Sequence, residues 1–122
     1  MGESETIIFI NEKYKTKLKL VKDKFNDYDA EDDNYICEIK NRRKYYNIKV
    51  IEAIKLFKNF RNANRLNKIF IYVVTDEKGV WIYNITSNID KIISTKPIAM
   101  LMPVSTDFEN KNKIIKYCFN LY

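Results

Sequence analysis

Apolar residues recur along the chain with strand-like and helical spacing, and these patterns predict most of its elements. The continuous β-branched and aromatic run 69–75 predicts a buried central strand. A turn at 76–79 then leads into a predicted return strand from Val80 to Asn84. These two strands form the most clearly patterned part of the sequence, and we expect them to be neighbours in one sheet.

Helical spacing predicts a helix over 47–61, followed by a polar loop over 61–67. The predicted apolar face of this helix consists of Val50, Ala53, Ile54, Phe57 and Phe60. The side predicted to face solvent carries Glu52, Lys55 and Asn59. We therefore expect an amphipathic helix that packs on the sheet.

The N-terminal part of the chain predicts a short helix over 4–12, with Ser4 as its N-cap. The β-branched residues in this stretch leave a strand as the alternative. Alternation of lysines with apolar residues over 15–22 predicts a half-exposed strand.

Residues 28–42 predict a hairpin that gathers charged side chains. One strand opens at Asp29, a polar turn follows at 32–34, and a second strand covers 35–42. Because side chains alternate between the faces of a strand, Glu38 and Lys40 are expected on one face of the second strand.

The C-terminal tail is patterned less clearly. Residues 89–93 suit a helical or irregular turn, Pro97 and Pro103 bracket an extended segment, and 110–121 suits a helix or a final strand. The order of helix, strand, hairpin, helix and two strands predicts an α/β fold, in which helices flank a mixed β-sheet.

Composition limits the class of protein. A chain of 122 residues with 46% hydrophobic residues predicts a single folded domain over 1–122. No stretch resembles a signal peptide or a membrane span, so we expect a soluble cytoplasmic protein without a membrane partner. The apolar surroundings of Cys37 and Cys118 predict buried, reduced thiols.

The charge balance and the lack of histidine narrow the possible chemistry. A net charge of +6 suits either a phosphate-rich partner or ordinary solubility. A chain with no histidine cannot use a histidine base, a Ser-His-Asp triad or a histidine-bound metal. Chemistry in this chain must therefore come from carboxylates, lysines and a metal that prefers oxygen ligands.

The predicted hairpin could supply such a metal site. Mg²⁺ prefers oxygen ligands and keeps several waters, so Asp29, Glu38 and the backbone carbonyl of Ile39 suffice to hold it. Lys40 on the same strand could orient or deprotonate a water bound to that ion. Asp27 is the alternative first ligand, and alternating charges on a solvated strand face are the alternative interpretation of the pattern.

The chain resembles the PD-(D/E)xK nuclease superfamily, and more narrowly its small phage-type members. The resemblance covers most of the chain. It rests on a helix, Tyr28-Asp29-Ala30, Glu38-Ile39-Lys40, a helix and a strand, together with the tail 102–110. It implies a restriction-endonuclease-like core and hydrolysis of nucleic-acid phosphodiesters, DNA being favoured. The implied cofactor is Mg²⁺, with Mn²⁺ as a substitute, and the implied roles are metal binding by Asp29 and Glu38 and catalysis by Lys40.

The same resemblance suggests further site residues. Members of the superfamily often place a glutamate from the first helix at the metal, and Glu5 matches best, ahead of Glu3 and Glu12. The helix after the core strand often contributes a lysine or glutamine, and the matching residue is Lys55. Tyr28 stands where a proline is usual, and homodimers are common among resolvase-like members.

Basic and aromatic residues directly after Lys40 suit binding of a nucleic-acid backbone. The predicted nucleic-acid-binding residues are Arg42, Arg43, Lys44, Tyr46, Lys55 and Lys113. Tyr45 and Tyr46 could equally pack under the second helix, and the tail lysines Lys111, Lys113 and Lys116 could be solvation charges.

Three functions remain at this point. The first is a metal-dependent nuclease that recognises DNA structure and not DNA sequence. The second is a catalytically silent nucleic-acid-binding or host-interaction protein with a nuclease-like fold, and the third is a structural interaction module. Cleavage of DNA separates the first from the second, and affinity for nucleic acid separates both from the third.

Overall fold

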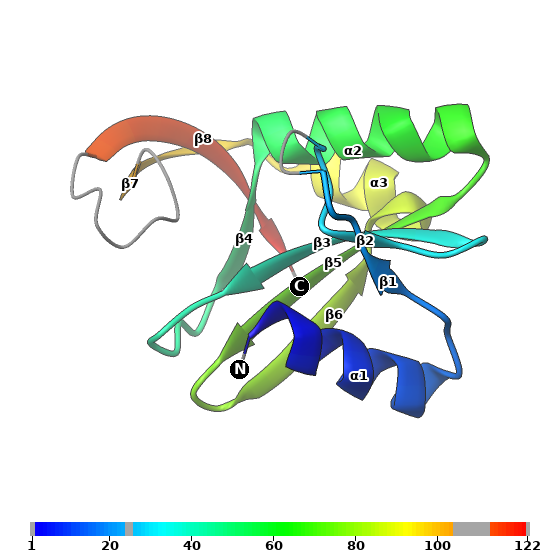
Figure 1. Cartoon of the computed structure of the whole chain (residues 1–122). Coiled ribbons are helices and arrows are strands. Elements are labelled where there is room, and N and C mark those ends of the chain that lie inside the picture. The colour runs from blue at the N-terminus through cyan, green and yellow to red at the C-terminus, as the bar shows by residue number, and fades with distance from the viewer. Residues whose placement is uncertain (1, 24–25, 104–112, 122) are drawn as a thin grey trace.

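The computed structural model describes residues 2–23, 26–103 and 113–121. Within these residues the chain forms three helices and eight strands, arranged in two sheets (Figure 1). In chain order the elements are α1 (Glu3–Tyr14), β1 (Lys19–Leu20), β2 (Ala30–Glu31), β3 (Tyr35–Asn41), β4 (Lys49–Glu52), α2 (Ala53–Leu66), β5 (Ile69–Asp76), β6 (Gly79–Asn84), α3 (Ile85–Ser94), β7 (Ile98–Pro103) and β8 (Lys113–Leu121). The fold is therefore mixed α/β, as the order of patterns predicts.

The first sheet has the strand order β1-β2-β3-β5-β6 among the described strands. β3 and β5 pair in parallel, whereas the other neighbours pair antiparallel. The predicted strands over 69–75 and 80–84 are confirmed as β5 and β6, joined at the turn before Gly79. β5 is buried on both faces, which is why its sequence is apolar without alternation.

Helices cover both faces of the first sheet (Figure 1). On one face, α1 packs Ile7 and Ile10 into a cluster with Cys37 and Ile39 of β3. On the other face, α2 and α3 pack into a larger cluster, of which Leu56 of α2 is a fully buried member. The face of β3 that carries Glu38 and Lys40 is the α2 side, because Cys37 and Ile39 point to α1.

The second sheet has the strand order β4-β8-β7, with antiparallel pairing throughout. β4 pairs with the end of β8, so that Lys49 lies opposite Leu121. The β7–β8 ribbon extends away from the first sheet, to the left of the view in Figure 1. Its outward face is apolar yet exposed, since Leu101 and Ile115 are both 66% exposed and lie opposite each other.

The predicted helix over 47–61 is wrong at its start. Residues 49–52 form β4, and α2 begins only at Ala53 and continues to Leu66 through the predicted loop. The predicted faces are wrong too, because Ile54 is 74% exposed whereas Asn59 is fully buried. The Asn59 Nδ2 donates a hydrogen bond to the backbone oxygen of Asp27 at 3.2 Å, which explains a polar residue at that buried position.

The N-terminal and hairpin predictions hold with changed boundaries. The predicted helix over 4–12 is α1, which begins after Gly2, and Ser4 is therefore inside the helix and not its N-cap. The predicted strand over 15–22 shrinks to the two residues of β1. The hairpin turn is confirmed, and the Asp32 side chain accepts hydrogen bonds from the backbone N–H groups of Asn34 and Tyr35, both at 2.8 Å.

The tail is ordered as a helix and a ribbon. Residues 89–93 belong to α3, the segment between the prolines contains β7, and the final stretch is the strand β8. Residues 104–110 of the tail motif and Lys111 lie outside the described residues. Both cysteines are buried, free thiols, as predicted. In the described part of the chain, no helix is long and apolar enough to cross a membrane.

A buried ion pair joins the two sheets near the turn between β5 and β6. The Lys49 Nζ lies 3.2 Å from the Asp76 Oδ2, and the two side chains are 5% and 1% exposed. The same Nζ lies over the rings of Tyr45 and Trp81, at 4.1 and 3.9 Å from their centroids. It also donates a hydrogen bond to the backbone oxygen of Tyr46. The Lys49 ammonium is therefore enclosed by a carboxylate, a carbonyl and two aromatic faces.

Candidate active site

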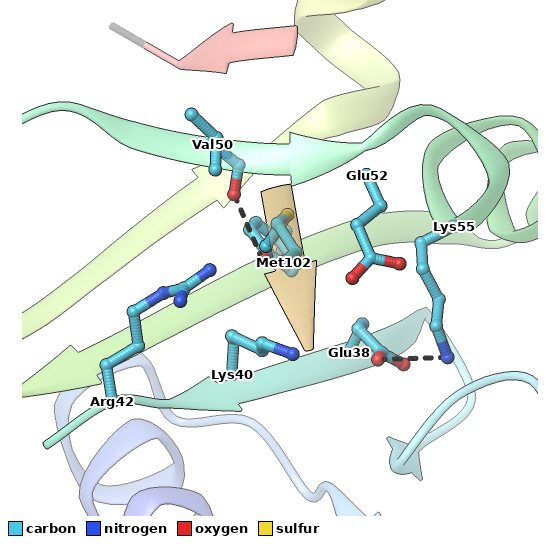
Figure 2. A pocket seen from close by; sticks show the side chains of 8 residues that line it. Glu38, Lys40, Arg42, Val50, Glu52, Lys55 and Met102 are labelled. Carbon is cyan, nitrogen blue, oxygen red and sulfur yellow. Dashed lines mark hydrogen bonds and ion pairs between the residues drawn. The ribbon is translucent and has the colours of Figure 1, made fainter. Parts of the chain in front are cut away.

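A small pocket lies where the two sheets meet, between β3 and the strands β4 and β7 (Figure 2). Its volume of about 20 Å³ has room for about one water molecule. The lining residues are Glu38, Lys40, Arg42, Val50, Glu52, Lys55, Tyr72 and Met102. The Tyr72 hydroxyl of β5 donates a hydrogen bond to the Val50 oxygen of β4 at 3.2 Å and so ties the sheets together at this point. Two carboxylates and three cations are thus gathered on a rigid framework.

Glu38 is the carboxylate in the floor of this pocket. It is only 9% exposed, and its Oε1 lies 3.7 Å from the Lys55 Nζ, which reaches over from α2 (Figure 2). Burial raises the pKa of Glu38 to about 7, and the negative charge of Asp29 adds to the rise. Lys55 and Lys40 offset part of this effect because they favour the ionised form. A nearby cation therefore stabilises the ionised form of this buried carboxylate strongly.

Asp29 directly precedes β2 and faces β3. Its Oδ2 accepts a hydrogen bond from the backbone N–H of Ile39 at 2.7 Å, and its own N–H donates to the Cys37 oxygen at 2.8 Å. Because the N–H and C=O of one strand residue point to the same edge, the Ile39 carbonyl points toward Asp29 as well. Burial raises the pKa of Asp29, whereas the Ile39 N–H, Lys55 and Lys40 lower it. The structure thus brings together the predicted ligands Asp29, Glu38 and Ile39.

Lys40 lies one pleat from Glu38 on the same face of β3 and lines the pocket. Burial lowers the pKa of Lys40, and the neighbouring charge of Arg42 lowers it further. The carboxylates of Glu52 and Glu38 act in the opposite direction. A lysine with a lowered pKa holds its proton less tightly, which is the property required of a proton-transferring side chain.

Among the glutamates of α1, Glu3 is coupled to this region. Glu3 and Glu5 are both exposed on α1, and partial burial together with the charge of Asp29 raises the pKa of Glu3. The sequence comparison favoured Glu5 as the metal-facing glutamate of the first helix, and that role remains a prediction. The helix begins at Glu3, one residue before its predicted start, so Glu3 lies in its first turn.

The fallback ligand Asp27 belongs to another set of contacts. Its Oδ1 lies 3.4 Å from the Lys58 Nζ, and its Oδ2 accepts a hydrogen bond from the Asn62 Nδ2 at 3.0 Å. Both partners are on α2, and these contacts lower the pKa of Asp27. Asp27 therefore anchors the chain before β2 to α2, and Asp29 is the aspartate coupled to Glu38.

Only some of the predicted nucleic-acid-binding residues lie at the pocket. Arg42 and Lys55 line the pocket, and the Arg42 guanidinium lies over the Tyr46 ring, 5.6 Å from its centroid. Arg43 and Lys44 are exposed in the segment between β3 and β4. The last of the set, Lys113, is exposed at the start of β8, where it pairs with Pro103 at the end of the ribbon distant from β4.

Sequence reasoning missed Glu52 as a pocket residue. The helical spacing placed it on a solvent-facing side, whereas it ends β4 and points into the pocket opposite Glu38 (Figure 2). Its Oε1 lies 3.1 Å from the Lys116 Nζ of β8. The β-branched pair Val50-Ile51 followed by an acidic residue was the available signal, since it suits a short strand ending at a helix N-terminus.

The donor set fits a hard divalent cation held partly by water. Asp29, Glu38 and the Ile39 carbonyl offer oxygen ligands, and both carboxylates have raised pKa values that a cation would reverse. No cluster of three or more acidic or cysteine side chains able to hold a metal is present among the described residues. In comparisons with known proteins, no family model, curated protein or solved structure matches the chain.

The raised pKa of Glu38 predicts a pH-dependent stability of the metal-free protein. The protonated form is favoured in the folded state, so this contribution is fully present below pH 4.5 and is lost as the pH rises through about 7. In EDTA at pH 8, Glu38→Gln is therefore expected to increase the free energy of unfolding by up to about 3 kcal/mol. Urea unfolding of both proteins at pH 4.5 and pH 8 measures this difference.

Two controls sharpen that measurement. At pH 4.5 the advantage of Glu38→Gln is expected to shrink, because the native glutamate is then protonated as well. Addition of Mg²⁺ at pH 8 is expected to stabilise the wild type more than the variant. Equal free energies of unfolding of the two proteins at pH 8 would contradict the conclusion that burial disfavours the ionised form of Glu38.

Proposed function

We propose that the protein is a Mg²⁺-dependent nuclease that hydrolyses phosphodiester bonds of nucleic acid, with DNA as the favoured substrate. The observation that carries the proposal is that Glu38 and Lys40 line a pocket with further cations, while Asp29 acts on Glu38 from the neighbouring strand. Two desolvated carboxylates and a lysine of lowered pKa are the groups that metal-assisted hydrolysis of a phosphodiester requires.

The order of elements supports this proposal. The resemblance to the PD-(D/E)xK superfamily rests on a helix, an aspartate before a strand, Glu-x-Lys on the next strand, a helix and a strand. In the chain these correspond to α1, Asp29 before β2, Glu38 and Lys40 on β3, α2, and β5 parallel to β3. The strand β4, inserted between β3 and α2, is a departure from that order. A restriction-endonuclease-like core is thus part of the proposal.

In the proposed mechanism, Asp29, Glu38 and the Ile39 carbonyl would hold the ion. When bound, Mg²⁺ would supply positive charge that polarises the phosphate and favours loss of a proton from the attacking water. Lys40 in its neutral form orients the attacking water and accepts its proton at Nζ as the water oxygen bonds to phosphorus. The P–O bond to the leaving sugar oxygen breaks, that oxygen takes a proton from a solvent water, and the protonated Lys40 stabilises the negative charge on the phosphate. Arg42 and Lys55 hold phosphates on either side of the cleaved bond. Contacts of this kind read backbone shape, so selectivity for nucleic-acid structure is expected over selectivity for sequence.

Cleavage assays with purified protein test the proposal. Labelled single-stranded, flapped, branched and fully duplex DNA, and single-stranded RNA, are incubated with Mg²⁺, Mn²⁺ or EDTA. We expect cutting of at least one DNA substrate with either metal and none in EDTA. We also expect Glu38→Ala to abolish cutting while binding survives, and Glu77→Gln, at an exposed turn outside the pocket, to cut as the wild type does.

The negative outcomes separate the other functions. Binding of DNA without cutting under any metal condition would favour a catalytically silent nucleic-acid-binding protein. Absence of both cutting and binding at low salt would leave a structural interaction module as the remaining explanation.

A further inference from the structure

The two described lysines of β8 lie on opposite faces of the β7–β8 ribbon. Lys116 pairs with Met100 and Ile114 pairs with Met102, so Lys116 shares a face with the methionine that lines the pocket. Lys113, an odd number of residues away, shares the opposite face with Leu101. The ribbon therefore turns one lysine toward the pocket and the other away from it.

Lys116 is held beside the pocket by Glu52. Its Nζ lies 3.1 Å from the Glu52 Oε1, and the two side chains are 20% and 17% exposed. The charge of Lys116 reaches the pocket, because it contributes to the lowered pKa of Lys40. Glu52 is the N-cap residue of α2, but its side chain makes no capping hydrogen bond to the helix. A change of partner at the Glu52 carboxylate therefore breaks no helix cap.

The charges around the pocket leave an excess of cations. With every group ionised, Lys40, Arg42, Lys55 and Lys116 carry four positive charges and Asp29, Glu38 and Glu52 carry three negative charges, so this group has a net charge of +1. The two glutamates differ in their surroundings, because Glu38 faces Asp29 and Lys55 whereas Glu52 faces Lys116. Glu52 is thus an ion-pair partner of Lys116, the cation on the β8 side of the pocket.

We propose that Lys116 is a substrate-binding residue that exchanges Glu52 for a backbone phosphate of the nucleic acid. The exchange replaces one anionic partner of Lys116 by another, so the ammonium keeps a counter-charge, and Glu52 keeps the positive charge of Lys40 nearby. A phosphate accepts hydrogen bonds from an ammonium at least as well as a carboxylate does. The face of the β7–β8 ribbon that carries Lys116 then contacts the nucleic acid, and Glu52 competes with the phosphate for Lys116 and so lowers the affinity for nucleic acid. This inference rests on the proposed function, because it requires a nucleic-acid substrate.

The opposing roles of the two residues predict opposite effects on binding. In EDTA, where metal contributes nothing, Lys116→Gln is expected to weaken binding of a labelled flapped DNA about tenfold. The slope of log affinity against log salt concentration is expected to fall in magnitude by about 0.7 to 0.9, the value for one phosphate contact. Glu52→Gln is expected to tighten binding about threefold or more, because the competing anion is removed.

The double variant tests whether the two effects belong to one contact. When Lys116→Gln is already present, Glu52→Gln is expected to lose most of its gain. Lys116→Arg is expected to retain the wild-type salt slope, and this variant keeps the test valid if Lys116→Gln folds poorly. Lys91→Gln, which removes an exposed charge of α3, serves as the matched control and is expected to change affinity less than twofold.

The outcomes distinguish this inference from the proposed function. If wild-type protein cuts DNA but Lys116→Gln binds as Lys91→Gln does, or if Glu52→Gln weakens binding, the exchange is overturned and the nuclease proposal stands. If wild-type protein neither binds nor cuts any nucleic acid, both proposals fail together.

Discussion

Replacing Lys40 by alanine is expected to slow DNA cleavage by about 10²- to 10⁴-fold, the usual contribution of a positioned proton-transfer group. The lysine lines the pocket beside Glu38, and burial together with Arg42 lowers its pKa. Both features suit an Nζ that accepts a proton from an attacking water. Because Arg42 and Lys55 remain as the proposed phosphate contacts, binding of the substrate is expected to weaken less than tenfold.

Single-turnover cleavage with enzyme in excess, together with binding in Ca²⁺, separates the two effects. Lys40→Arg is the matched control, because arginine keeps the positive charge but does not release its proton at accessible pH. It is expected to restore binding and to leave cleavage impaired by at least about 10²-fold. Full cleavage by Lys40→Arg would assign Lys40 a purely electrostatic role, and full cleavage by Lys40→Ala would remove it from the mechanism.

The second large effect concerns stability. Asp76→Asn is expected to lower the free energy of unfolding by about 3–5 kcal/mol, the usual cost of leaving one partner of a buried ion pair without its counter-charge. Asp76 and Lys49 are 1% and 5% exposed, with 3.2 Å between the Oδ2 and the Nζ. The aromatic rings of Tyr45 and Trp81 favour the Lys49 cation, but they do not replace a full negative charge.

Chemical unfolding measured by circular dichroism and tryptophan fluorescence provides the test, because Trp81 lies in the same cluster. The double variant Lys49→Met/Asp76→Asn is expected to recover much of the loss, since it leaves no buried charge. Lys58→Gln breaks the Lys58–Asp27 pair, whose side chains are 56% and 36% exposed, and is expected to cost less than about 1 kcal/mol. A similar cost for Asp76→Asn and Lys58→Gln would contradict the assigned role of the buried pair.

The strands around the site were predictable from sequence because their signals are local. The buried run of β5, the turn before Gly79 and the alternation that joins Glu38 to Lys40 depend on neighbouring residues only. These patterns also placed Asp29 across from Glu38, since a short hairpin allows few registers. The charge coupling of Asp29 with Glu38 agrees with that placement.

The second sheet was not predictable in the same way, because its pairing joins distant parts of the chain. Lys49 lies opposite Leu121, and no sequence pattern near residue 49 predicts that pairing. In the sequence alone, the spacing of Val50 and Ile54 predicts a shared helical stripe, although Ile54 is 74% exposed in the structure. The error hid Glu52, and with it the Glu52–Lys116 contact, which spans 64 residues in sequence.

The meeting of two sheets at one pocket also has a consequence for sub-global opening. Asp29, Glu38 and Lys40 are carried by the first sheet, whereas Glu52, Met102 and Lys116 are carried by strands of the second. Strands whose outward face is exposed belong to the less protected cooperative units of a fold, whereas β5 is buried on both faces. Amide exchange is therefore expected to be faster in β7 and β8 than in β3 and β5. Mild denaturant would then open β7 and β8, which carry Met102 and Lys116, while Asp29, Glu38 and Lys40 stay in place on the first sheet.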